Sequence, residues 1–84
     1  MIRLVYLARL RDAFGTRAED WPLAGSSTTV AAVLEALRAR GGIWADELAP
    51  GRAVRVAVNQ TLAHDESAVA PGDEVALLPP VTGG

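Results

Sequence analysis

The sequence predicts an α+β fold, a mixed sheet of four to five strands with one main helix packed on one face. Segments with the composition of β-strands occur near both ends of the chain, at residues 2–8 and 74–78. Between them, residues 30–37 repeat their apolar side chains at helical spacing. One helix in a chain of 84 residues can cover only one face of such a sheet, so the other face should meet solvent.

The first third of the chain predicts two strands and a short helix. Residues 2–8 are rich in β-branched and aromatic side chains, which favours a strand. Residues 9–14 predict a short turn of helix that ends at Gly15. A weaker strand is expected over residues 17–23, with Trp21 as its anchor in the core.

The main helix is expected to begin after Thr29, whose hydroxyl can accept from a free N–H of the first turn. Arg38 and Arg40 fall in the expected last turn, where positive charge suits the helix dipole. The two glycines at 41–42 are expected to stop the helix. Its apolar stripe consists of Val30, Val33, Leu34 and Leu37.

Residues 43–51 are expected to form an irregular connection after the helix. Trp44 and Leu48 in this connection are expected to cover one end of the core. Alternating valines then predict a third strand over residues 54–58.

The last part of the chain predicts a hairpin and a final strand. Asn59-Gln60 indicates a turn, because Asn tolerates positive φ, and residues 62–63 indicate a short strand after it. A second turn at residues 71–73 precedes the final strand over 74–78. The order strand, strand, helix, strand, short strand, strand is the β-grasp arrangement.

Length and composition bound the class of protein. The 84 residues predict one domain, with a folded body at residues 1–78 and a flexible tail at residues 79–84. Half of the residues are apolar, but no run of them is long enough for a membrane span. A net charge of −2 without a basic stripe argues against nucleic acid as a partner. The absence of cysteine excludes thiolate metal sites and is compatible with a cytoplasmic location.

The tail reads Pro-Pro-Val-Thr-Gly-Gly. Its two prolines end the hydrogen-bond ladder of the last strand, because proline has no N–H and fixes φ. Its two glycines lack Cβ, so this end can lie extended in a narrow slot. We therefore predict that the functional group is the carboxylate of Gly84. The tail that presents it consists of Pro79, Pro80, Val81, Thr82 and Gly83. The alternative is a chain end without function.

All eight basic side chains are arginines. A guanidinium stays protonated and is a poor nucleophile. If the carboxylate of Gly84 is activated as an acyl donor, no lysine amine of this chain can capture it, and the α-amino group of Met1 is the competing amine that remains.

The face of the sheet away from the helix is also expected to be apolar. If Ile2, Leu4 and Tyr6 face the helix, the alternation of a strand turns their neighbours outward. A contiguous exposed apolar patch is a candidate docking surface, although scattered exposed leucines are ordinary. The outward set is Val5, Leu7, Ala76 and Leu78, with Leu62 at one edge.

Residues 72–84, which read GDEVALLPPVTGG, resemble the C-terminus of the MoaD/ThiS family of sulfur carriers, and within it the MoaD group of molybdopterin synthase small subunits. Residues 58–62 look like the family's central strand and turn, and residues 2–12 are similar to its first strand and the turn after it. The resemblance is weakest over residues 16–27 and 39–53.

The resemblance implies a ubiquitin-like β-grasp fold and a role as sulfur carrier. In this family a MoeB-like enzyme uses ATP to adenylate the terminal glycine, here Gly84, and a sulfur donor converts the acyl-adenylate to a thiocarboxylate. The tail then enters a MoaE-like large subunit, and sulfur passes to cyclic pyranopterin monophosphate to build the molybdopterin dithiolene. Two small and two large subunits form a heterotetramer.

The resemblance also implies where the large subunit binds. The hydrophobic contact positions of the family correspond to Leu7, Leu62 and Leu78, of which the first and last are aromatic in the family pattern. We expect no bound cofactor and no metal. Because the chain itself supplies no plausible base, the catalytic side chains are expected on the partners.

Two other hypotheses stay open. The chain could serve a related pathway of thiamine, cysteine or tRNA thiolation, or it could be a ubiquitin-like modifier or a plain binding module. None of its titratable side chains predicts catalysis by the chain itself. His64, Asp12, Asp73 and Glu74 are expected to be turn or surface residues, and Asp65-Glu66 lacks the spaced ligands of a calcium loop.

Overall fold

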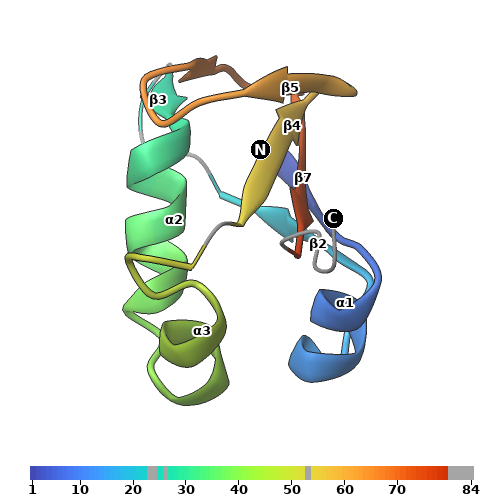
Figure 1. Ribbon diagram of the computed structural model, residues 1–84. Coiled ribbons are helices and arrows are strands. Elements are labelled where there is room, and N and C mark those ends of the chain that lie inside the picture. Colours follow the sequence, from blue (N-terminus) through green and yellow to red (C-terminus); the bar gives the residue numbers. More distant parts are fainter. Residues whose placement is uncertain (23–24, 26, 53, 80–84) are drawn as a thin grey trace.

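The computed structural model describes residues 1–22, 25, 27–52 and 54–79 (Figure 1). Within these residues, five strands form one mixed sheet in the order β2-β1-β7-β4-β5. The central pair, β1 and β7, is parallel, and the other pairs are antiparallel. The strands are β1 (Ile2–Tyr6), β2 (Ala18–Trp21), β4 (Arg55–Val58), β5 (Thr61–Ala63) and β7 (Glu74–Leu78).

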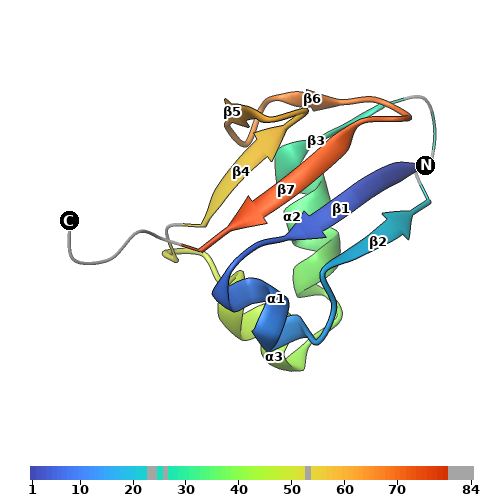
Figure 2. The same ribbon diagram turned by 90° about the vertical axis from the view of Figure 1, so that its right-hand side faces the viewer.

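Helix α2 (Val30–Arg38) packs across one face of the sheet, and Figure 2 looks onto the opposite face with α2 behind the strands. Two short helices, α1 (Arg9–Phe14) and α3 (Gly42–Glu47), pack against each other at one end of the molecule. The α+β prediction of a mixed sheet under one main helix is confirmed. We call the sheet face toward α2 the inner face and the other the outer face.

The inner face and α2 enclose the core. The hydroxyl of Thr29 accepts from the N–H of Ala32 at 3.2 Å, so the predicted N-cap is present. The predicted stripe of α2 is buried, as are Ile2, Leu4 and Tyr6 of β1 and Val75 and Leu77 of β7. Burial of these side chains is the main stabilising term of the fold.

The region after α2 differs from the prediction in two ways. The helix ends at Arg38, so Arg40 is not in its last turn, and the glycine pair begins α3 instead of ending α2. Gly41, at a φ of 77°, turns the chain so that residues 42–47 form a helix and not an irregular connection. This helix lays the Trp44 ring on the Phe14 ring, with the two ring centroids 3.9 Å apart.

A polar cluster closes the same end of the core. Glu19 accepts from the hydroxyl of Tyr6 at 2.6 Å and from both terminal nitrogens of Arg40 at 2.8 and 3.0 Å. The Arg40 guanidinium also lies over the rings of Trp21 and Trp44, at 4.9 and 4.4 Å from their centroids. Burial and the neighbouring Glu19 carboxylate raise the pKa of Tyr6, whereas the bonds from Arg40 lower the pKa of Glu19. The cluster therefore ties β2 to the segment between α2 and α3.

The turns and the smallest strands complete the fold. Asn59 and Gln60 join β4 to β5 with positive φ values of 51° and 70°, as predicted for Asn59. A small separate sheet pairs β3 (Thr28–Thr29) with β6 (Ala68–Val69). These two strands were not predicted, because two residues are too few for an alternation to be visible in the sequence.

Candidate functional site

The strand register places one apolar side chain of each strand in a row across the outer face. Val5 lies opposite Ala18 on one side and Ala76 on the other. Ala76 in turn pairs with Ala57, and Ala57 pairs with Leu62. Neighbouring side chains in such a row lie within contact distance, so the row is one continuous strip. Val5, Ala76 and Leu62 were predicted to point away from the helix, and they do.

Leu7 and Leu78 extend this strip toward one end of the sheet. Because β1 and β7 are parallel, their C-terminal ends lie at the same edge, and the N–H of Leu7 donates to the carbonyl of Leu77 at 3.1 Å. Leu7 keeps 38% of its surface exposed and Leu62 keeps 65%, whereas Leu78 is half-buried. We define the outer patch as Val5, Leu7, Ala18, Ala57, Leu62, Ala76 and Leu78.

Sequence reasoning missed two members of the outer patch and overestimated the exposure of a third. Ala18 and Ala57 join it only through the pairing of their strands, which no local pattern reveals. Ala76 points outward as predicted but is buried, with 7% of its surface exposed. Its side chain is a single methyl group in the middle strand, between Val5 and Ala57, and these neighbours cover it.

The tail prediction can be followed only as far as Pro79. This residue directly follows β7 and is half-buried, at the edge of the sheet where Leu7 and Leu78 lie. Pro80, Val81, Thr82, Gly83 and Gly84 lie outside the described residues. The structure therefore fixes the point from which the predicted tail departs, and that point adjoins the outer patch.

The opposite end of the outer face is polar. Arg3 pairs in register with both Asp20 and Glu74, and its Nη1 lies 3.3 Å from Asp20 Oδ1. Nearby, Asp73 accepts from the N–H of Ala70 at 2.8 Å and from the side-chain amide of Asn59 at 3.0 Å. Both hydrogen bonds lower the pKa of Asp73, and the one from the backbone of Ala70 has the larger effect. The outer face thus changes from polar to apolar along β7, toward Pro79.

The structure also places the other titratable side chains that the sequence analysis named. His64 is exposed, and its Nδ1 accepts from the N–H of Glu66 at 3.2 Å. Asp12 is exposed on helix α1 and not in a turn, and Glu74 is half-buried at the start of β7. Among the described residues, no group of three or more His, Cys, Asp or Glu is placed to hold a metal ion. Nor is any helix in the described part of the chain long and apolar enough to cross a membrane.

The β-grasp sheet and the apolar patch beside the end of its last strand define a class of small carrier and modifier domains, and the comparisons place the chain within it. Residues 4–84 match the ThiS family, so the chain belongs to this family. Two relatives named molybdopterin synthase sulfur carrier subunit match over the full length of both chains. The one from Haemophilus influenzae is 43% identical, and the one from Escherichia coli is 39% identical.

Solved structures agree on the fold. SAMP1 of Haloferax volcanii, a small archaeal modifier protein, superposes with a TM-score of 0.77 at 30% identity and covers 99% of this chain and 98% of its own. CysO, solved in a complex with BexX from Amycolatopsis orientalis, gives a TM-score of 0.68 over both whole chains. At 24% identity this second likeness concerns the fold alone. The resemblance to the MoaD/ThiS family and the β-grasp prediction are thereby confirmed.

Proposed function

We propose that this chain is the sulfur-carrying small subunit of a molybdopterin synthase. The observation that carries the proposal is the match over its whole length to two relatives named molybdopterin synthase sulfur carrier subunit. In this proposal Gly84 holds the sulfur as a C-terminal thiocarboxylate. The chain acts in the cytoplasm, and its outer patch docks on a MoaE-like large subunit.

The reaction starts from the carboxylate of Gly84, which is unreactive until it is activated. A free α-carboxylate has a pKa of roughly 3.5, so at neutral pH it is ionised and resists nucleophiles. A MoeB-like enzyme joins an oxygen of the Gly84 carboxylate to the α-phosphorus of ATP and releases pyrophosphate. A sulfur donor then attacks the carbonyl carbon, and AMP leaves. A glycine leaves this carbonyl unhindered, which suits attack inside a narrow enzyme site.

The loaded tail delivers its sulfur inside the large subunit. The thiocarboxylate sulfur forms a bond to a carbon of cyclic pyranopterin monophosphate while a carbon–oxygen bond of that carbon breaks, and the oxygen leaves as water or on the phosphate. Hydrolysis of the resulting thioester by water then leaves the sulfur on the pterin and restores the carboxylate of Gly84. Catalytic side chains belong to the partners in this proposal, and the chain binds no cofactor of its own. The chain contributes by presenting the tail and by fixing its position relative to the active site of the partner.

In this proposal, docking of the outer patch fixes the position of the tail. Leu7 and Leu78 lie at the edge of the sheet where Pro79 departs, and Leu62 projects from the edge strand β5. Burial of such side chains against a partner is favourable at about 25 cal/mol per Å² of apolar surface. We therefore propose these three leucines as the main anchors of the large subunit, with two copies of each subunit in the assembly.

A reconstituted transfer reaction tests this proposal. The thiocarboxylated chain is mixed with the large subunit and cyclic pyranopterin monophosphate, and dithiolene formation is measured. The wild-type chain should support it. A chain lacking Gly83-Gly84 should support none while retaining the melting temperature of the wild type. A wild-type chain that is loaded, folded and bound to the large subunit but yields no dithiolene would contradict the proposal.

A protein modifier is the second candidate, because SAMP1 is 30% identical over nearly the whole chain. A modifier would be recovered from cells in isopeptide linkage between Gly84 and lysines of other proteins. A carrier for thiamine, cysteine or tRNA thiolation would instead bind the enzyme of that pathway through the same patch. Affinity purification followed by peptide mass spectrometry separates the three, since only the modifier leaves a C-terminal peptide of this chain, ending at Gly84, linked to foreign lysines.

A further inference from the structure

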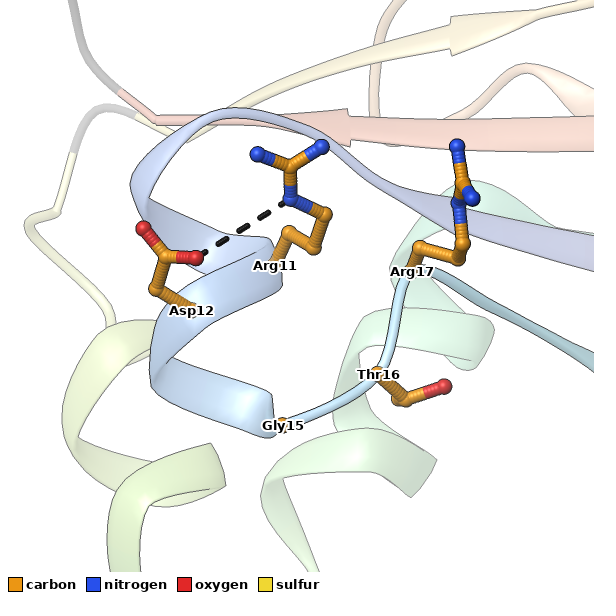
Figure 3. Close-up of a pocket in the computed structure, with 5 residues that line it drawn as sticks. All are labelled: Arg11, Asp12, Gly15, Thr16 and Arg17. Carbon is orange, nitrogen blue, oxygen red and sulfur yellow. Dashed lines mark ion pairs between the residues drawn. The ribbon is translucent and has the colours of Figure 1, made fainter.

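An open depression of about 580 Å³ lies between α1 and the start of β2. It is lined by Arg11 and Asp12 of α1 and by Gly15, Thr16 and Arg17 of the following loop. Figure 3 shows Arg11 and Arg17 on the two sides of this loop, with their guanidinium groups pointing to the same side and the Thr16 hydroxyl turned away. Two cations thus face one solvent-filled space in a chain whose net charge is −2.

Among the residues that the structure describes, no hydrogen bond forms from the side chain of Arg11 or Arg17. The Nε of Arg11 lies 3.9 Å from the adjacent Asp12 carboxylate, a long contact between two well-exposed side chains. Within the described residues, Arg11 makes no ion pair closer than this one, and Arg17 makes none within 4.0 Å. By contrast, Arg9 and Arg40 make close pairs with carboxylates.

The backbone holds both arginines in place. The N–H of Gly15, at a φ of 71°, donates to the carbonyl of Arg11 at 3.1 Å and closes α1. The N–H of Tyr6 donates to the carbonyl of Arg17 at 2.9 Å, and the Thr16 hydroxyl donates to the carbonyl of Ala18 at 3.1 Å. A ligand that binds here orders only the two side chains, which limits the entropic cost of binding.

Along the chain, the residues that line the depression come between two members of the outer patch, Leu7 and Ala18. The carbonyl of Leu7 accepts from the N–H of Leu10 at 3.1 Å, so α1, which carries Arg11, begins directly after this patch residue. Arg17 lies one residue before Ala18, the patch member on β2. A protein that covers the outer patch therefore has its border close to both arginines.

We infer that the depression receives an acidic segment, one or two aspartate or glutamate side chains, of the protein that docks on the outer patch. A guanidinium fork matches the geometry of a carboxylate in a bidentate manner. The negative charge of the whole chain disfavours an extended polyanion such as nucleic acid, which leaves a short acidic segment as the fitting occupant. The identity of the partner rests on the proposed function, but the carboxylate chemistry does not.

The first experiment needs no partner protein. The ¹⁵N-labelled chain is titrated with a hexaglutamate peptide at low salt, with hexaglutamine as the neutral probe. We expect saturable shifts of the amide signals of residues 15–17 with hexaglutamate only. The double variant R11Q/R17Q should bind at least about tenfold more weakly. The matched control R52Q removes an exposed arginine outside the depression and should bind as the wild type does.

Three results of this titration would overturn the inference. They are no shift at residues 15–17, an equal loss in R52Q, or inorganic phosphate binding as tightly as the peptide. The last result would assign the depression to small anions instead of an acidic segment.

A second experiment uses the purified large subunit of a molybdopterin synthase. A charge at the rim of an interface acts mainly on the association rate, so R11Q/R17Q should associate about tenfold more slowly and with less dependence on salt. Unchanged association would overturn the inference for this partner. If the wild type itself fails to bind the large subunit, the proposed function fails, while the peptide titration still decides whether the depression binds carboxylates.

Discussion

On the inner face of the sheet Leu4 and Leu77 are fully buried under α2, whereas on the outer face Leu7 and Leu62 keep 38% and 65% of their surface exposed. Both faces use the same alternation along the same strands. The difference is that, among the described residues, helix α2 covers the inner face and no helix covers the outer one. An exposed apolar strip of this kind is a candidate docking surface, and it is the one that we propose for the partner.

Arg40 and the two arginines beside the outer patch also differ in their contacts. Arg40 is held by Glu19 and by the rings of Trp21 and Trp44. Beside the outer patch Arg11 and Arg17 point into open space. Arg40 is thus part of the folded body, whereas we propose that Arg11 and Arg17 bind another molecule.

The largest effect is expected from a core truncation. Leu77→Ala removes a fully buried side chain and should lower the free energy of unfolding by about 2–5 kcal/mol. Leu62→Ala on the outer face is the matched control and should change it by less than about 0.5 kcal/mol. Denaturant titrations of both variants measure the difference. Similar losses in the two would erase the proposed distinction between the faces.

The next effect concerns binding. Leu62→Asp should leave the melting temperature unchanged but weaken association with the large subunit by about 2 kcal/mol or more, because it puts a charge into a desolvated contact. Ile43→Asp is the control, since Ile43 is also exposed, at 41%, but lies on α3 away from the outer patch. Titration calorimetry of both variants with the large subunit measures the two affinities. Equal weakening by the two substitutions would mean that the outer patch is not the docking surface.

A smaller effect is expected from Glu19→Gln, which removes the carboxylate that pairs with Arg40. The loss should be about 1–2 kcal/mol at pH 7. Since the pKa of Glu19 is lowered in the fold, its contribution is present above its ordinary value of 4.5 and is lost as pH falls through the folded value. Unfolding measured from pH 7 down to pH 3 should therefore show a shallower acid loss in the variant than in the wild type. Parallel curves would rule out this role of Glu19.

The smallest effect is a gain. Gln60 holds a φ of 70° in the turn between β4 and β5, a conformation that favours glycine. Gln60→Gly creates the Asn-Gly pair preferred in such two-residue turns and should raise the free energy of unfolding by about 0.5–1 kcal/mol. Because Gln60 is exposed, no packing is lost. A decrease on thermal or denaturant unfolding would show that the turn geometry is not the controlling factor.

The sequence predicted the features that depend on periodic patterns and on neighbouring residues. The stripe of α2, the cap at Thr29, the alternation of β1 and the final strand over residues 74–78 all follow from periodicity and local chemistry. The outward set that includes Leu7, Leu62 and Leu78 followed from the same alternation once the helix had been assigned to one face.

The sequence did not reveal what depends on contacts between distant segments. Helix α3 forms because Gly41 redirects the chain and because the ring of Trp44 stacks on the ring of Phe14, thirty positions earlier in the sequence. The pairing of Glu19 with Arg40 likewise joins residues 21 positions apart. The depression beside Arg11 arises only once the loop at Gly15 has folded. These features come from tertiary packing, which overrides local preference.

The most direct measurement is the mass of the chain after incubation with ATP, a cognate activating enzyme and a sulfur donor, followed by fragmentation to locate the change. The account predicts that one oxygen is replaced by one sulfur and that the replacement lies at the carboxyl group of Gly84. An unchanged mass with an activating enzyme and donor of proven activity, or a sulfur located anywhere else on the chain, would contradict it.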